Sequence, residues 1–298
     1  MTPSVSQFEE IVAAGTPLTL AQAEALLTDP DLVSVGVLGE QARIATTGDR
    51  VAYCRIAGTT GAGAVAGADH AGEVRITQAP ASADEAISIV GRTVASAAGK
   101  PLTGFSLGAL LQISNGDHLA LSDLAGALKA AGLDAVADAP LDLLGDTENA
   151  IEVVRAVLHG GLAVRRATIE RADIGARLAL VERAVEIQKE TSALRALAPL
   201  PRLDPSEAPA TGYDDVRTIA AARLMARAIP FIQVDWPLYG PKLAQVAICY
   251  GANDIDGIAV IDVLGLGQRR SPKEDIERQI RAAGCVPVER DGRYEWPK

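Results

Sequence analysis

The residues most able to do chemistry in this chain are eight polar or aromatic side chains at or near the ends of expected β-strands. Carboxylate, guanidinium and amide groups that converge at strand ends can hold a polar small molecule through hydrogen bonds and ion pairs. We therefore predict that these residues bind a ligand, and the sequence assigns none of them a catalytic step. The eight candidates are Arg166, Glu170, Gln233, Asp235, Trp236, Asn253, Asp254 and Asp262.

Structural roles compete with ligand binding at several of these positions. Asn253 and Asp254 can shape a turn, because Asn and Asp side chains hydrogen-bond readily to nearby backbone groups. Asp235 stands before a Trp-Pro pair that can fix a strand end, and Arg166 and Glu170 can form a surface ion pair. The sequence leaves both interpretations open.

Metal binding is not expected. The three cysteines, Cys54, Cys249 and Cys285, lie far apart and form no CxxC pair. This spacing excludes a disulfide framework and a zinc knuckle, and it predicts free thiols in a reducing compartment. Asp254, Asp256 and Asp262 could offer oxygen ligands to a hard cation, but aspartates are also common in turns.

A nucleotide cofactor is not expected either. The glycine-rich segment 58–72 follows an expected strand and contains Gly61, Gly63 and Gly67. A dinucleotide fingerprint needs its third glycine one residue earlier, followed by a helix whose N–H groups hold the pyrophosphate. Here residues 69–72 lead into another expected strand. We therefore interpret 58–72 as a loop and predict no cofactor.

The elements that would position the candidates alternate between strand and helix along most of the chain. Strict alternation predicts a parallel sheet covered by helices, and the number of units favours an α/β fold of the TIM-like (β/α) barrel type, complete or partial. Helices are expected at 19–27, 82–98, 122–131, 146–159, 174–194, 214–228, 241–250 and 272–283. Strands are expected at 51–56, 74–77, 104–111, 133–138, 162–170, 195–200, 230–236 and 257–264, with an extended piece at 285–291.

The chain is expected to divide at the end of the glycine-rich loop. Residues 1–72 would contain N-terminal helices, a strand and that loop. Residues 73–298 would form the barrel with a C-terminal extension. We expect the two parts to make one structural domain overall.

Composition restricts the partners. The 298 residues include 28 Lys and Arg against 38 Asp and Glu, a formal net charge of −10. Without a basic cluster to neutralise phosphates, we expect no nucleic-acid partner. No apolar run approaches the roughly 18 residues of a membrane span, and the first residues are too polar for a signal peptide. We therefore predict a cytoplasmic protein without a membrane partner.

The last third of the chain carries a resemblance to a known family. Its most specific strings are Gln233-x-x-Trp236, GPKLAQ at 240–245, GAND at 251–254 and PVERD at 287–291. AGLDA at 131–135 and GDRV at 48–51 are weaker, collinear landmarks. Together they strongly resemble the radical S-adenosylmethionine enzymes of menaquinone and deazaflavin biosynthesis: aminofutalosine synthase, dehypoxanthine futalosine cyclase and FO synthase. The resemblance implies a (β/α) barrel.

The chain departs from that family where an iron–sulfur cluster would be held. In the family, a CxxxCxxC loop follows the GDRV landmark, and its three thiolates bind a [4Fe–4S] cluster that holds S-adenosylmethionine. At the corresponding spacing after Cys54, this chain has Gly58 and Gly61. One thiolate cannot replace three. The resemblance therefore implies a radical S-adenosylmethionine fold without the cluster and without radical chemistry.

Two functions follow as expectations. The first is a paralogue of futalosine-pathway enzymes that binds a pathway intermediate or a protein partner, either an intact radical S-adenosylmethionine paralogue or a second copy in a homodimer. The alternative is a non-radical enzyme that acts on a futalosine-type or related small molecule at the C-terminal rim of the barrel.

Overall fold

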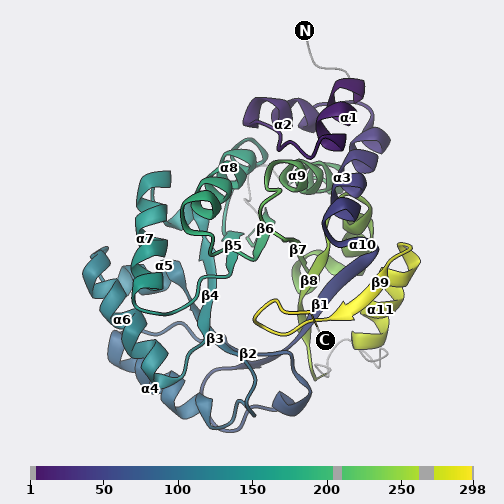
Figure 1. Ribbon diagram of the computed structural model, residues 1–298. Coiled ribbons are helices and arrows are strands. Elements are labelled where there is room, and N and C mark those ends of the chain that lie inside the picture. The colour runs from purple at the N-terminus through teal and green to yellow at the C-terminus, as the bar shows by residue number, and fades with distance from the viewer. Residues whose placement is uncertain (1–4, 204–209, 262–271, 297–298) are drawn as a thin grey trace.

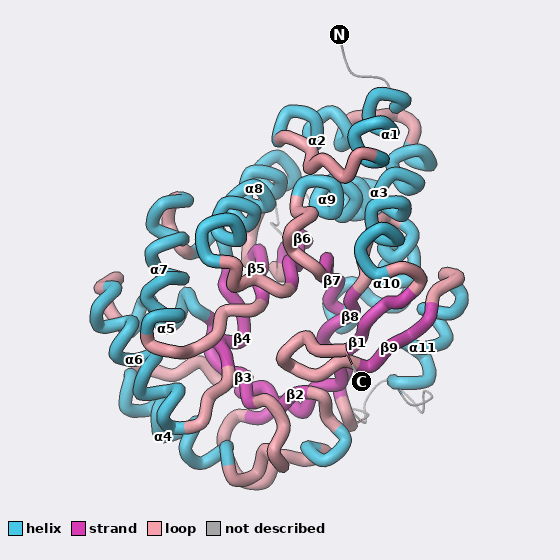
Figure 2. The backbone as a smooth tube through the Cα atoms, in the orientation of Figure 1, coloured by secondary structure: helices cyan, strands magenta, loops and turns pink. Residues whose placement is uncertain are grey.

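Eight parallel strands close into a barrel in the computed structural model, which describes residues 5–203, 210–261 and 272–296. Figure 2 shows the strands as an inner ring with helices outside it. Each strand pairs with the next, and β1 closes the ring by pairing with both β8 and β2. The strands are β1 (Arg50–Thr59), β2 (Glu73–Ile76), β3 (Leu102–Ser106), β4 (Ala135–Pro140), β5 (Arg166–Ile169), β6 (Ala196–Pro201), β7 (Phe231–Asp235) and β8 (Asp254–Ala259).

A ninth strand, β9 (Val286–Glu289), joins the barrel from outside (Figure 1). It pairs in parallel with the first half of β1, over Arg50–Tyr53. The second half of β1, over Ile56–Thr59, pairs with β2 on the same edge. β1 is therefore long enough to pair with β9 along its first half and with β2 along its second half.

The helices after the first strand surround the barrel, and three further helices precede it (Figure 1). Short 3₁₀ turns lie at Ala68–His70 and Leu141–Leu143. The helices are α1 (Val5–Ala13), α2 (Leu20–Leu27), α3 (Leu32–Thr47), α4 (Ala83–Val94), α5 (Leu107–Ile113), α6 (His118–Ala131), α7 (Thr147–His159), α8 (Ile174–Thr191), α9 (Gly212–Met225), α10 (Trp236–Cys249) and α11 (Pro272–Ala282).

Helix starts are fixed by short polar side chains. An oxygen of the residue before the helix accepts a backbone N–H that has no partner inside the helix, which stabilises the first turn. Thr19 and Thr211 also form capping boxes with Gln22 and Asp214. The other side-chain caps are Asp31, Ser82, Asp117, Asp146, Asp173 and Asp235.

The N-terminal helices pack on the outside of the ring, with α2 and α3 against α9. Close approach is needed where α3 passes the end of α10. A Cβ at Gly39 would lie 2.3 Å from the Tyr250 carbonyl oxygen, so only glycine fits there. The chain then enters the barrel directly through β1.

The predicted barrel is confirmed and is complete. Two of the differences from the expected element boundaries bear on the site. The strand expected at 104–111 ends at Ser106, and the apolar run that follows forms α5, because its Leu and Ala favour helix. β8 begins at Asp254 rather than at 257, because two aspartates that resemble turn residues are buried inside the barrel. The proposed division of the chain at residue 72 stays a prediction.

Among the described residues, no helix combines the length and the apolar composition needed to cross a membrane.

Candidate functional site

The interior of the barrel is charged, and Asp256 of β8 lies at its centre. Its carboxylate accepts hydrogen bonds from Arg75 of β2, at 2.8 Å, and from Arg166 of β5. A third guanidinium, that of Arg290, lies 3.5 Å away. Burial alone would raise the pKa of Asp256, but the arginines, Arg75 foremost, hold it well below its usual range. The arginines therefore favour the ionised form of Asp256 in the folded protein.

A second pair closes the end of the barrel where the strands begin. Arg290, just after β9, donates two hydrogen bonds of 2.7 Å to Asp254, and neither side chain is exposed. The guanidinium also lies 3.8 Å from the ring centre of Tyr294. Tyr294 packs on Phe231, the first residue of β7. The loop after β9 lies across this end of the barrel (Figure 1).

Glu73 of β2 completes the interior network. It accepts a hydrogen bond of 2.7 Å from Arg75 and one of 2.5 Å from Thr103 of β3. Gln233 of β7 donates to Asp254 at 2.5 Å. Buried charges are costly unless they are paired and hydrogen-bonded, and these are. The inner residues are thus held in place by one another.

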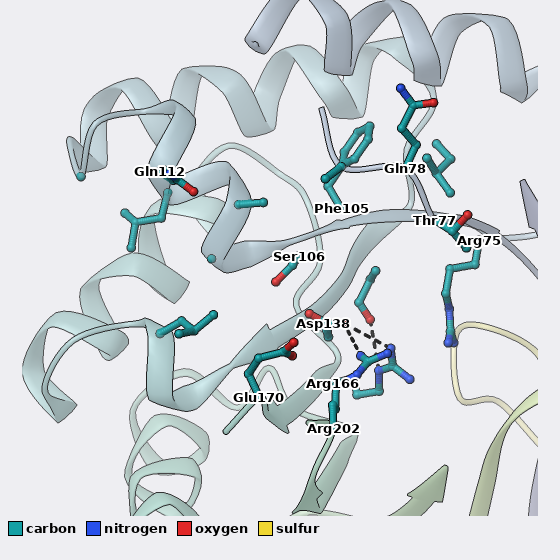
Figure 3. A pocket seen from close by; sticks show the side chains of 18 of the residues that line it. Arg75, Thr77, Gln78, Phe105, Ser106, Gln112, Asp138, Arg166, Glu170 and Arg202 are labelled. Atoms are coloured by element: carbon teal, nitrogen blue, oxygen red, sulfur yellow. Dashed lines mark hydrogen bonds and ion pairs between the residues drawn. The ribbon is translucent and has the colours of Figure 1, made fainter. Parts of the chain in front are cut away.

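The opposite end, where the strands finish, opens into a cavity of about 850 Å³ (Figure 3). Asp138 of β4 lies at its base and accepts hydrogen bonds from Arg202, at 2.7 Å, and from Arg166, at 3.5 Å. Ile76, Phe105 and Leu111 give the cavity apolar walls. Polar groups facing it come from Thr77, Gln78, Ser106, Gln112, Asn115 and Glu170. A volume of this size suits a small organic ligand.

Four of these six side chains make no side-chain hydrogen bond within the described residues: those of Ser106, Gln112, Asn115 and Glu170. Two of the four are the carboxylate of Glu170, just after β5, and the hydroxyl of Ser106, at the end of β3; Figure 3 shows both directed toward the cavity. Burial raises the pKa of Glu170, an effect that nearby Arg202 opposes and that Asp138 reinforces. Both groups are free to bind a ligand.

The eight sequence-predicted candidates divide between the two ends of the barrel. Arg166 and Glu170 line the main cavity. Asp235 begins α10 at the same end and, with Gln233, lines a smaller void beneath it. Trp236 is partly buried against the core. Asp262 lies outside the described residues.

Asn253 and Asp254 lie at the other end, away from the cavity. Asn253 is buried, accepts the Ile232 N–H at 2.8 Å and donates to the Pro230 carbonyl at 3.0 Å. These contacts hold the starts of β7 and β8 together. Arg166 and Glu170 do not pair with each other in the structure. Whether any candidate binds a ligand stays a prediction.

Sequence reasoning missed Arg75, Asp138, Arg202 and Ser106. No local sequence pattern marks Arg75, Asp138 or Arg202, because their positions at the cavity depend on ion pairs with residues far away in the sequence. Ser106 did have one, since residues 104–108 read Gly-x-Ser-x-Gly at a strand–helix turn. In a hydrolase elbow the serine itself occupies a strained turn beside a histidine base. Here the positive φ of 60° belongs to Phe105, and no histidine is among the cavity-lining residues.

The described residues contain no group of three or more His, Cys, Asp or Glu arranged to hold a metal ion. Cys54 is buried within β1, and the sequence has no cysteine between it and Cys249. Burial raises the pKa of the Cys54 thiol, so the thiolate form that metals bind is disfavoured.

The deciding comparison concerns the last third of the chain. Residues 196–298 match the sequence model of the CofH/MqnC C-terminal region. The predicted resemblance to radical S-adenosylmethionine enzymes is thereby confirmed. This part includes β6–β9 and the segment that supplies Arg290 and Tyr294.

Curated relatives extend the likeness. A 5-amino-6-(D-ribitylamino)uracil--L-tyrosine 4-hydroxyphenyl transferase 2 of Methanosarcina mazei is 32% identical over 200 residues, which cover 56% of this chain and 52% of that enzyme. Aminodeoxyfutalosine synthase of Streptomyces coelicolor is 38% identical over 93 residues, 29% of this chain and 24% of that enzyme. The matches thus span about half, or less, of the length of these relatives.

Solved structures share the fold. Methylornithine synthase matches with a TM-score of 0.67 and 15% identity, covering 94% of this chain and 97% of that one. The hydrogenase maturase HydG from Carboxydothermus hydrogenoformans gives a TM-score of 0.67 and 12% identity, covering 95% and 79%. At these identities the likeness shows the barrel fold alone.

Proposed function

We propose that this chain is a relative of futalosine-pathway enzymes that binds a small polar molecule, a pathway intermediate, in the main cavity and performs no radical chemistry. The observation that carries the proposal is the cavity itself. Its floor is fixed by Asp138, Arg166 and Arg202, whereas Glu170 and Ser106 keep unused hydrogen-bonding capacity. Fixed charges beside free polar groups and apolar walls are typical of a small-molecule site.

The chemistry of the available donors supports the absence of a cluster. A [4Fe–4S] cluster of this type needs three thiolates, and the segment that follows β1 offers none. Cys54 itself is enclosed in β1, and its burial disfavours the thiolate. The residues present therefore do not fit the group that the family resemblance implies, and we assign no reaction step to it.

Anaerobic reconstitution tests this part of the proposal. Purified chain incubated with iron, sulfide and reductant, then desalted, should retain no stable absorbance near ~400 nm, the region of iron–thiolate charge transfer. A matched sample of an intact family member provides the positive control. Stoichiometric iron and sulfide bound to this chain would refute the proposal.

Ligand binding is tested with the molecules that the relatives' names suggest. Aminodeoxyfutalosine and 5-amino-6-(D-ribitylamino)uracil should each be titrated by calorimetry, and at least one should bind. Ala109→Phe places a bulky ring in the cavity and should abolish that binding. Ala130→Phe makes the same change on the exposed face of α6 and should leave it intact. Equal binding by both variants would place the ligand elsewhere.

A second candidate function is non-radical catalysis at this rim, as predicted from the sequence. The raised pKa of Glu170 favours it, because burial shifts this carboxyl group toward the protonated form that can donate a proton to a ligand. The discriminating measurement is product formation from a bound ligand under multiple-turnover conditions. Turnover that Glu170→Gln abolishes would establish an enzyme, whereas unchanged ligand after prolonged incubation would leave a binding protein.

A protein partner remains part of the proposal. Co-purification of the tagged chain with an intact radical S-adenosylmethionine paralogue, or self-association in sedimentation experiments, would identify it. A monomer that captures no paralogue would restrict the function to small-molecule binding.

A further inference from the structure

The charged groups inside the barrel do not balance. Four carboxylates, those of Glu73, Asp138, Asp254 and Asp256, each contact an arginine. The four arginines that match them are Arg75, Arg202, Arg290 and Arg166. Asp235, at the end of β7, is left over.

Asp235 has one satisfied oxygen and one open one. Its Oδ1 accepts the Leu238 N–H at 3.2 Å and caps α10. Asp235 forms no ion pair within the described residues. Burial and the neighbouring Asp256 raise the pKa of this carboxyl group, against the opposing charge of Arg166. A partner with positive charge is therefore missing.

An inner void adjoins Asp235. Its volume is about 10 Å³, and its lining includes Thr168, Gln233 and Asp235. Thr168 is 1% exposed, and its Oγ1 has no hydrogen-bond partner in the part of the chain that the structure describes. Buried hydroxyl groups without partners are rare, since each costs free energy of desolvation. The void thus combines an unpaired carboxylate with an unpartnered hydroxyl.

The size and charge of the inner void define what fits. A space of about 10 Å³ holds one water-sized group, and an –NH₃⁺ group has about that size. Its three donors suit a carboxylate and a hydroxyl oxygen. Arg166 and Arg202 also line the void, but each is engaged by its own aspartate, Asp256 and Asp138. Their positive charges are therefore already compensated.

The inner void and the main cavity are neighbours with two lining residues in common. Arg166 and Arg202 line both spaces. The terminal group of a ligand could lie in the inner void, beside Arg202, while the rest of the same ligand lies in the main cavity. The two spaces can therefore serve one ligand.

We propose that the inner void binds the ammonium group of an amine ligand, through Asp235 and Thr168, while the rest of that ligand occupies the main cavity. The proposal rests on the proposed small-molecule function of the cavity. It adds the chemical class of the ligand and assigns Asp235 and Thr168 as the residues that recognise it.

Methylammonium is the probe, because it carries the proposed group and little else. In about 100 mM methylammonium chloride, the Tm of the full chain should exceed its Tm in equimolar sodium or potassium chloride. Asp235→Asn should abolish this difference while keeping the cap of α10, since Asn is an equally good capping residue. Thr168→Val, of nearly the same shape, should reduce it.

Glu170→Gln provides the discriminating comparison, because it removes the other unpaired carboxylate and leaves the inner void intact. It should retain the full methylammonium effect. The proposal is overturned if wild type shows no difference between the salts, if potassium matches methylammonium, or if Asp235→Asn keeps the effect and Glu170→Gln loses it. Proton–carbon NMR of ¹³C-methylammonium gives the same comparison independently of stability.

The two proposals fail separately. If neither of the two titrated molecules binds but methylammonium binds through Asp235, the amine site stands and the pathway assignment falls. If one of them binds in the main cavity and methylammonium has no effect in any variant, the cavity function stands and the amine site is wrong.

Discussion

At the scale of single residues, the buried carboxylate of Asp256 organises the barrel interior. It contacts Arg75 and Arg166 directly and lies close to Arg290, so three strands and the C-terminal segment meet at one side chain. Removing one member of a buried ion pair leaves its partners buried without an opposite charge. The resulting loss of stability is larger than the net stabilisation that the intact pair provides.

Asp256→Asn should therefore lower the free energy of unfolding by about 3–5 kcal/mol. Because the folded-state pKa of Asp256 lies below its unfolded value, its contribution is complete above about pH 4 and declines as the pH falls further. Urea unfolding of wild type and variant across this range measures both effects. Glu152→Gln, at an exposed pair on α7, is the control and should change stability by less than about 0.5 kcal/mol. A constant difference at every pH would contradict this account of Asp256.

Glu170 gives the opposite pH dependence. Its folded-state pKa is raised, so ionisation of Glu170 costs stability as the pH rises through the unfolded and then the folded pKa. Glu170→Gln should match wild type below pH 4 and have the higher Tm at pH 7. A lower Tm at pH 7 would show that the ionised carboxylate has a partner in solution.

At the scale of elements, the helix starts with simple local caps, at 82, 146 and 173, were predicted to within one residue. Their caps are local, since the side chain of Asp146, Asp173 or Ser82 needs only the backbone three residues on. The start of β8 was mispredicted because the burial of Asp254 and Asp256 depends on arginines far away in the sequence. No local pattern could reveal that two aspartates lie inside a barrel. The same reason hid Arg75 and Arg202.

One helix ends without the residue its geometry favours. Ser192, after α8, is exposed and has φ 53°, in the left-handed region that glycine adopts without strain. Ser192→Gly should raise the free energy of unfolding by about 0.5–1 kcal/mol. The same substitution within a helix, Ser88→Gly on α4, should lower it by about 0.5 kcal/mol. Chemical unfolding at one pH compares the two, and equal signs would contradict the argument.

At the scale of the whole molecule, the match to the family model and most of the cavity draw on different parts of one barrel. The part that matches the family model, residues 196–298, supplies Asp254, Asp256 and Arg290 of the interior network. Arg75, Ser106, Asp138 and Glu170 of the cavity come from the part before it. The alternation of strands and helices was enough to predict the barrel. The shape of the cavity was not predictable, because it depends on side chains from four different strands, from α5 and from loops that follow strands.

The position of Arg290 also sets an order of events during synthesis. The ribosome makes all eight barrel strands before it reaches this residue, whose guanidinium neutralises Asp254. Asp254 is therefore synthesised before the guanidinium that neutralises it. A chain shortened before Arg290 would leave the Asp254 carboxylate without its ion-pair partner and would lack the Tyr294 ring at that end of the barrel.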